Sequence, residues 1–309
     1  MILQRTIEKS ITISGIGLHS GARINLKLRP AEANTGIVFY RTDGEQTIAI
    51  KASHENVVDT RMATVIGSQG ATVSTIEHFM AALSAFGIDN LNVDIDGPEV
   101  PVLDGSAAPF IREIQQAGIK ALPQSRKFIA IRKPLEIIEG EKRISIIPSR
   151  FFRITFDIAF DHKAISVQQY SMKFTTENFC KDIASARTFG FLQEVEYLKA
   201  NGLARGGSLE NAVVIDNDGV MNPEGLRYPD EFVRHKILDA CGDFSLIGHP
   251  ILGHIRAFKA GHDLNAKMVQ TILEHPSHWT YVEFSEQAVR EARRANAGAF
   301  AIDLAWSKA

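Results

Sequence analysis

Apolar and polar residues alternate along much of the first hundred positions, which is the pattern of half-buried β-strands. Within residues 22–31, the side chains of Ile24, Leu26 and Leu28 fall on one face and polar side chains fall on the other. Further strands, joined in part by glycine-rich turns, are predicted at residues 5–17, 35–43 and 90–97. The first part of the chain therefore predicts a sheet with one face buried.

In two segments of the same part of the chain, the apolar positions recur with the period of an amphipathic helix. These segments cover residues 74–87 and 104–118. Small hydroxylated residues near each start are typical N-caps, and glycine is the typical residue just past a helix end. The predicted caps are Ser74 or Thr75 and Ser106, and the predicted stops are Gly87 and Gly118.

The same order of elements recurs after residues 121–127, which combine proline, polar residues and charge and are predicted to be a linker. The predicted elements are strands at 127–138, 142–149, 152–160 and 254–260 and helices at 230–246 and 263–274. An extra stretch with its own helix, residues 184–216, interrupts this order and is interpreted as an insertion. A chance recurrence of such patterns is the alternative to an internal duplication.

The predicted fold class is α+β, with two similar domains that each consist of a β-sheet layer with helices. The predicted boundaries are 1–122 for the N-terminal domain, 127–285 for the C-terminal domain with its insert 184–216, and 286–309 for a C-terminal tail. A length of 309 residues is consistent with two domains.

Composition narrows the possible partners. Hydrophobic residues make up 45% and charged residues 23%, as in ordinary globular proteins, and the net charge of -2 gives no basic excess for nucleic acid or acidic lipid. The first residues lack a signal-peptide pattern, and no stretch reaches the roughly 20 apolar residues of a membrane span. Only Cys180 and Cys241 are present, so we expect a protein of the reducing cytoplasm and no thiolate zinc cage. We also expect a monomer.

The helix predicted at 230–246 carries the first candidate chemistry. His235 and Asp239 are four residues apart, so both side chains lie on one helix face and converge on one point. Imidazole nitrogen and carboxylate oxygen are ligands that Zn²⁺ accepts. The alternative is a solvated surface pair, but the apolar neighbours of this helix indicate burial, and a buried aspartate needs a cation or several donors.

The helix predicted at 74–87 carries a second candidate, in which Glu77 and His78 are adjacent. Zincin proteases place a glutamate next to a metal-binding histidine, but their second histidine is missing here because Ala82 stands at that position. If His78 binds metal, then His235 and Asp239 complete a three-ligand set that leaves one position open, as in catalytic zinc sites. The two helices are equivalent in the proposed duplication.

His262 precedes the last predicted helix, which Asp263 is expected to cap. An exposed turn histidine is the commoner situation for a single histidine. The functional interpretation is a proton donor or an electrostatic stabiliser near the metal. Asp243, one turn beyond Asp239, is expected to hold this histidine and to favour its charged form.

Seven motifs together resemble the UDP-3-O-acyl-N-acetylglucosamine deacetylase family, zinc amidases that catalyse the committed step of lipid A biosynthesis. The motifs occur in order over about residues 1–285, and they are GIGLHSG, STIEHFMAAL, DGSAAPF, ARTFGF, GGSLENAVV, RHKILDACGD and GHDLN. The resemblance implies that the helices of the two domains are sandwiched between the two sheets and that zinc lies at their junction. Iron(II) also suits such ligands.

The resemblance also implies roles for individual residues. His78, His235 and Asp239 would be the metal ligands, and the catalytic residues would be Glu77 as general base, His262 with Asp243 behind it, and Thr188, which helps to polarise the amide oxygen. The implied substrate contacts are Lys236 to phosphate, Phe160 to uracil, Lys259 to the nucleotide, and Leu18 and Phe189. The insert 184–216 would form a channel for the 3-O-acyl chain of the UDP-linked sugar.

Two other functions remain open at this point. One is another zinc hydrolase, such as a peptidase or a different deacetylase, for which the phenylalanine- and leucine-rich insert has no evident use. The other is a non-catalytic acyl-nucleotide or metal binder on the same fold, which would not need Glu77 and His262.

Overall fold

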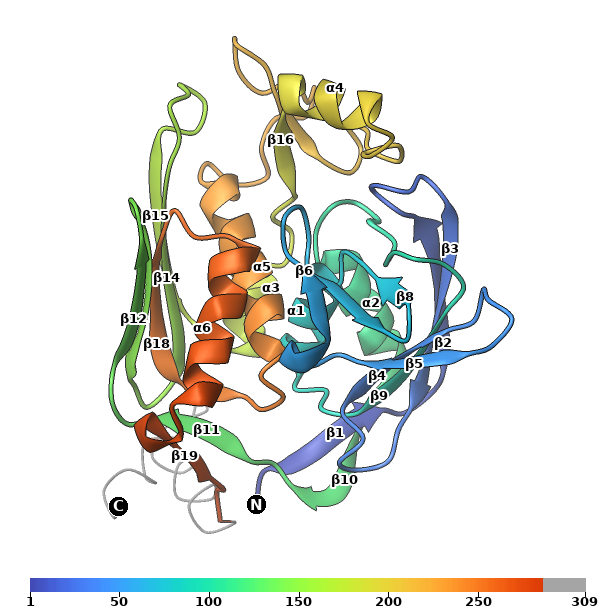
Figure 1. The fold of residues 1–309 in the computed structure, drawn as a ribbon, viewed down its shortest axis with the longest axis vertical. Coiled ribbons are helices and arrows are strands. Elements are labelled where there is room, and N and C mark those ends of the chain that lie inside the picture. The colour runs from blue at the N-terminus through green and yellow to red at the C-terminus, as the bar shows by residue number, and fades with distance from the viewer. Residues whose placement is uncertain (286–309) are drawn as a thin grey trace.

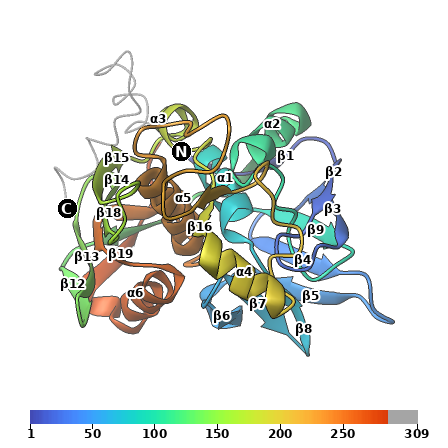
Figure 2. The same cartoon turned by 90° about the horizontal axis from the view of Figure 1, so that it is seen from above.

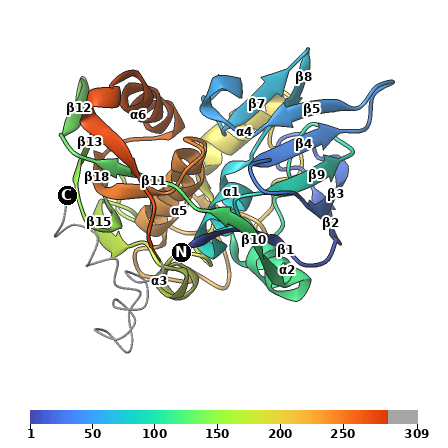
Figure 3. The same cartoon turned by 90° about the horizontal axis from the view of Figure 1, so that it is seen from below.

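The computed structural model describes residues 1–285, and the predicted tail 286–309 lies outside the described residues. Two large sheets form the outer layers, and helices lie between them (Figure 1). This arrangement confirms the predicted α+β fold class with helices between two sheets. Views from above and below show the same layers, with the sheet of the first half on one side and that of the second half on the other (Figures 2 and 3).

The N-terminal sheet has five strands in the order β2-β3-β9-β4-β5. Its strands are β2 (Ile11–Ile16), β3 (Arg23–Pro30), β4 (Ile37–Arg41), β5 (Ile48–Lys51) and β9 (Leu91–Ile95). Only the β4–β9 pair is parallel. As the alternation predicts, Ile24, Leu26 and Leu28 of β3 are fully buried, because one face of the sheet is turned toward the helices.

The C-terminal sheet has seven strands and repeats this topology. Its strands are β11 (Phe128–Ile131), β12 (Leu135–Glu139), β13 (Lys142–Pro148), β14 (Phe152–Ala159), β15 (Val167–Lys173), β18 (Ile251–Phe258) and β19 (Trp279–Val282). Within it, β12, β13, β18, β14 and β15 are successive neighbours, and only β14–β18 is parallel in that run. Strand order and strand direction are therefore the same in both halves, as the predicted duplication requires.

Helices of the two halves meet in the middle layer. They are α1 (Glu77–Phe86) and α2 (Ala108–Ala117) from the first half and α5 (Glu231–Ser245) and α6 (His262–Glu274) from the second, with a shorter α3 (Thr176–Asp182). In both halves the first of these helices precedes the strand that pairs in parallel and the second follows it, so α1 and α5 are equivalent. They pack against each other across the junction (Figure 1).

The predicted helix stops are confirmed, but none of the predicted N-caps is the N-cap residue of its helix. Gly87 ends α1 with φ 64°, and Gly118 follows α2 with φ 73°. The N-cap of α1 is Ile76 without a side-chain bond, because the hydroxyl of Thr75 is bound to Glu99 and that of Ser74 to a backbone carbonyl.

The caps of the other two helices differ from expectation by one residue or more. The N-cap of α2 is Ala107, although Oγ of Ser106 accepts a bond from the amide of Ala108 at 3.3 Å. The last helix begins at His262 itself, so Asp263 lies in the first turn and binds Lys267 instead of capping.

The predicted linker 121–127 is not a loop. Residues 119–125 form β10 (Ile119–Ser125), which pairs with β1 (Leu3–Ile7), and β11 begins three residues later. The sequence pattern missed this strand because its partner is at the other end of the N-terminal half. A further small sheet contains β6 (Val57–Asp59), β7 (Val65–Ser68) and β8 (Ala71–Val73).

The predicted insert contains β16 (Phe189–Phe191), α4 (Leu192–Ala200) and β17 (Val213–Ile215), and it projects from the top of the view in Figure 1. It belongs to the second half in sequence but docks on loops of the first half. The amide of Gly206 donates to the carbonyl of Leu18 at 3.0 Å, and that of Thr188 donates to the carbonyl of Gly105 at 2.8 Å. The insert therefore bridges the two halves. Among residues 1–285, none of the helices has the length and apolar character needed to cross a bilayer.

Candidate metal centre and active site

The candidate site lies where α1 meets α5. α1 contributes Glu77 and His78, while α5 contributes His235, Asp239 and Asp243 on successive turns. All five side chains are at most 5% exposed, although each is polar or charged. Burying so many polar and charged groups in an otherwise apolar interface between two helices costs free energy unless they are hydrogen-bonded, paired or bound to a metal ion.

The three predicted metal ligands converge. One ligand atom from each of His78, His235 and Asp239 lies within 4.8 Å of the other two. Asp239 Oδ1 is 3.2 Å from His235 Nε2 and 3.4 Å from His78 Nε2. Ligands at zinc distances of about 2.0–2.1 Å in a tetrahedron are about 3.3 Å apart, so the spacing suits a divalent ion.

The protonation of these groups also suits a metal ion. Oδ1 of Asp239 is buried and has no hydrogen-bond donor within the described residues. Burial opposes its charge, but charged neighbours, Lys236 among them, outweigh that effect and hold the pKa of Asp239 well below its usual range. Burial lowers the pKa of His235 to about 3, so the ring is neutral and can coordinate. Its Nδ1 is 3.1 Å from the carbonyl oxygen of Ala186, which leaves Nε2 directed at Asp239.

Glu77 lies at the edge of this cluster. Its Oε2 accepts a hydrogen bond from the backbone amide of Thr64 at 3.0 Å, and its Oε1 is 3.9 Å from His262 Nε2. Burial raises the pKa of Glu77, against the opposing influence of His262 and His78. A carboxylate with a raised pKa beside a candidate metal site is suited to accept a proton near neutral pH.

His262 is paired as expected with Asp243. Nδ1 of His262 is 2.9 Å from Oδ2 of Asp243. Burial disfavours the imidazolium, but the carboxylate of Asp243, with smaller contributions from Glu77 and Asp239, outweighs it and raises the pKa of His262 to about 10. The side chain is therefore charged at neutral pH, with Nε2 turned toward Glu77.

Two residues that the sequence did not single out complete this arrangement. Thr64 donates its hydroxyl to Oδ1 of Asp243 at 2.6 Å and its amide to Glu77, so one residue supports both groups. Asn265 donates Nδ2 to Oδ2 of Asp243 at 2.9 Å. Asn265 lies in the GHDLN motif and could have been suspected, whereas Thr64 carries no signal because its partner Asp243 is 179 positions away.

Two of the expected substrate contacts lie beside the metal cluster. Lys236 Nζ is 2.9 Å from Asp239 Oδ2 and 5.4 Å from the ring centre of Phe189, with 23% of its side chain exposed. The ring of Phe189 is 6.2 Å from that of His235. The ring of Phe160 packs at 6.0 Å from Phe189 and 5.9 Å from Phe191. Because Phe189 and Phe191 belong to the insert, this aromatic cluster connects the insert with the candidate metal ligands.

The contacts of the other three expected residues are with neighbouring segments. Thr188 is held by its backbone between Gly105 and Val213. Leu18 contacts the insert through its carbonyl oxygen. Lys259 pairs with Glu141 at 2.7 Å. The described residues show no bond from these three side chains to the metal ligands.

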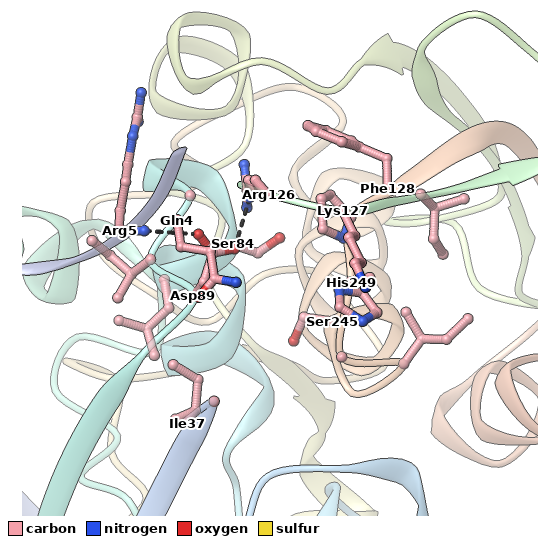
Figure 4. A pocket seen from close by; sticks show the side chains of 18 of the residues that line it. Gln4, Arg5, Ile37, Ser84, Asp89, Arg126, Lys127, Phe128, Ser245 and His249 are labelled. Atoms are coloured by element: carbon pink, nitrogen blue, oxygen red, sulfur yellow. Dashed lines mark hydrogen bonds and ion pairs between the residues drawn. The ribbon is translucent and has the colours of Figure 1, made fainter. Parts of the chain in front are cut away.

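A separate cavity of about 1190 Å³ is lined at the opposite ends of the same helices, by Ser84 of α1 and Ser245 of α5 among others (Figure 4). Figure 4 shows Asp89 between Arg5 and Arg126, with Arg126 Nε 2.7 Å and Arg5 N 2.9 Å from its carboxylate. Because its lining contains neither the three ligands nor Glu77 or His262, this cavity is distinct from the candidate site.

The family model and the relatives compared with this chain point to one kind of enzyme. A family model described as UDP-3-O-acyl N-acetylglycosamine deacetylase matches residues 4–274. Proteins named UDP-3-O-acyl-N-acetylglucosamine deacetylase are 64% identical in Syntrophotalea carbinolica, over 93% of both chains, and 56% identical in Citrifermentans bemidjiense, over 93% of this chain and 94% of the relative. A protein of the same name in Geotalea uraniireducens is 52% identical over the full length of both. The chain therefore belongs to the UDP-3-O-acyl N-acetylglycosamine deacetylase family.

Proposed function

We propose that this protein hydrolyses the N-acetyl group of UDP-3-O-acyl-N-acetylglucosamine to give UDP-3-O-acyl-glucosamine and acetate, in the biosynthesis of lipid A. The observation that carries the proposal is one buried cluster that combines three metal ligands with Glu77 and with the His262–Asp243 pair. Family membership supplies the substrate. In these roles the cluster would provide a metal site, a base and an acid, which are the groups that amide hydrolysis requires.

His78, His235 and Asp239 would hold the metal ion, either zinc or iron(II). Two imidazoles and one carboxylate fit both ions, and the orphaned Oδ1 of Asp239 supports a cation there. When bound, such an ion supplies a Lewis acid that acidifies water and polarises a carbonyl group.

The protons move between two groups of the protein. Water would add to the amide carbon while Glu77 takes a proton of that water on Oε1, and the C–N bond would break afterwards. The leaving nitrogen receives a proton from His262 Nε2, with Glu77 as the alternative donor. Thr188, at the root of the insert, would donate its hydroxyl to the developing oxyanion. Asp243 keeps His262 charged for this step.

We place the substrate along the aromatic cluster of Phe160, Phe189 and Phe191. We assign Lys236 to a phosphate of the nucleotide, Phe160 to stacking on uracil, Lys259 to a nearby contact with the nucleotide, and Leu18 and Phe189 to further substrate contacts. The insert 184–216 would form the acyl channel, which its contacts with both halves of the molecule support.

We also propose the division into domains 1–122 and 127–285, which the repeated strand order supports. The cysteines Cys180 and Cys241 are free, which is consistent with a reducing cytoplasm. A monomer is the expected assembly, and light scattering on the purified full chain would test it.

The decisive test is turnover by the purified, metal-loaded protein. Incubation with UDP-3-O-acyl-N-acetylglucosamine should release acetate and a free amine in equal amounts, and Glu77→Ala should remove this activity. Hydrolysis of a peptide or another acetamide at a higher kcat/KM would favour a different amidohydrolase. Binding of the substrate without acetate release would favour the non-catalytic binder.

A further inference from the structure

Arg187 and Glu231 form an ion pair in the interior, at the root of the insert. Their side chains are 1% and 0% exposed. The backbone amide and Nε of Arg187 each donate to Oε1 of Glu231 at 2.9 Å, and Nη2 donates to Oε2 at 3.2 Å. Nη1 donates to Glu224 at 2.5 Å and Nη2 to the carbonyl of Gly225 at 2.6 Å. Each nitrogen of this guanidinium has a partner in the protein, so it is not directed at a substrate.

The ion pair connects residues 186–188 with helix α5, and both segments contribute groups to the proposed active site. Arg187 lies between Ala186, whose carbonyl accepts from Nδ1 of the metal ligand His235, and Thr188. Glu231 lies on α5 one turn before His235. The backbone amide of Thr188 is bound to Gly105 of the first half at 2.8 Å. The pair therefore fixes residues 186–188 against the helix that carries two of the three ligands.

A purely structural role does not explain this pair well. Desolvating two charges offsets most of their attraction, so buried ion pairs contribute little to stability compared with apolar residues of the same size. Their forked geometry, however, fixes relative orientation, and arginine provides it where lysine does not. The position beside a metal ligand is where orientation has the largest effect on chemistry.

We propose that Arg187 and Glu231 are positioning residues of the active site. Through Ala186 they hold His235 with its proton on Nδ1 and Nε2 free for the metal, and they fix Thr188 in place next to this contact. This inference rests on the proposed deacetylase function, but its effect on metal binding can be measured without substrate.

The test compares Arg187→Lys and Glu231→Gln with the parent in three measurements. Co²⁺ titration gives the affinity and the visible absorption bands of the metal site, kinetics with the acylated UDP-sugar gives kcat and KM, and urea unfolding gives stability. We expect each variant to lose about 10- to 100-fold in Co²⁺ affinity or in kcat. We expect altered Co²⁺ bands and a KM within about threefold of the parent, because the pair does not touch substrate. Glu231→Gln carries the test if Arg187→Lys does not fold.

Arg234→Lys is the matched control. Arg234, on the first turn of α5, pairs with the N-cap residue Asp230 at 2.5 Å, and its guanidinium lies over the rings of Tyr170 and Tyr228. We expect parent values of Co²⁺ affinity, absorption bands and kcat for this variant. Parent-like bands, Co²⁺ affinity and kcat in folded Arg187→Lys or Glu231→Gln would overturn the positioning role, as would equal losses in Arg234→Lys. An inactive parent would refute the proposed deacetylase instead, and the Co²⁺ measurements would still decide the positioning role.

Discussion

The Cα of Gly242 on α5 lies directly against the backbone of Glu77 on α1. A Cβ at Gly242 would be 2.0 Å from the carbonyl oxygen of Glu77, far inside van der Waals contact. Gly242 lies between Asp239 and Asp243 in sequence, so the two helices approach closely where the proposed metal ligands and the proposed base converge. Glycine at this position is what allows side chains from two halves of the chain to share one site.

Gly242→Ala should therefore destabilise the protein. Helix propensity alone would favour alanine over glycine by about 1 kcal/mol. Forcing the two helices apart opposes this and should cost about 1–3 kcal/mol or more, with a loss of metal affinity. Urea unfolding and Co²⁺ titration measure both effects. Gly44→Ala is the control, because the nearest atom to its added Cβ is 3.6 Å away. A Gly242→Ala protein as stable as the parent would show that the helices can separate without loss.

His78→Ala and His235→Ala should each remove the bound metal. The three ligand atoms lie within 4.8 Å of one another, and loss of either imidazole leaves only two ligands. Metal analysis of the purified variants by plasma mass spectrometry measures the occupancy. His254→Ala is a suitable control, because His254 is on β18 and bonded to Thr155. Full occupancy in both ligand variants would rule out this site.

Glu77→Ala should keep the metal and lose most of the rate. Glu77 adjoins a ligand but is placed to accept a proton, and a positioned general base contributes about 10²–10⁴-fold. The measurements are metal content and kcat of the same preparation. Glu77→Gln keeps the shape and the acceptor for the Thr64 amide, so it separates loss of the base from loss of packing. Near-normal turnover by metal-replete Glu77→Ala would exclude the assigned role.

Activity should depend on the 3-O-acyl chain of the substrate. The insert presents Phe189 and Phe191 next to Phe160, and each buried methylene of an acyl chain gains about 0.8 kcal/mol. Removal of the 3-O-acyl group should therefore lower kcat/KM by several orders of magnitude. Paired assays on acylated and non-acylated UDP-N-acetylglucosamine provide the test, and equal turnover would refute the channel.

The pH–rate profile should be bell-shaped, with Glu77 on the acid limb and His262 on the basic limb. The pKa of His262 is raised from 6.5 to about 10 by Asp243, so the charged form persists through neutral pH and is lost as pH rises through the raised value. The basic limb should therefore lie between 6.5 and about 10. The stability contributed by the His262–Asp243 pair is fully present below the unfolded pKa and is lost over the same window.

His262→Gln tests the assignment of the basic limb, since glutamine keeps a donor but removes the titrating charge. We expect this limb to disappear or move. A basic limb that stays where the parent has it would assign it to another group. Asp243→Asn, which removes the partner that raises this pKa, should shift the limb to lower pH.

The sequence by itself determined the local parts of this protein, because local spacing dictates which side chains share a face. The alternation in β3 placed Ile24, Leu26 and Leu28 inside, and the spacing of His235 and Asp239 placed both on one face of α5. Glycine at positions 87 and 118 marked two helix ends for a reason that depends only on backbone geometry. The motifs, taken in order, indicated the family.

Only the tertiary structure decided which distant segments these helices and strands contact. The hydroxyl of Thr64 reaches Asp243, and the carbonyl of Ala186 reaches His235, over separations of 179 and 49 residues that no local pattern encodes. The strand β10 formed where a linker was expected because β1 supplies its backbone hydrogen bonds from the start of the chain. Likewise Thr75 does not cap α1, because Glu99 binds its hydroxyl. Hydrogen bonds and close contacts between distant segments depend on the packed arrangement, which is why they appear only once the chain is folded.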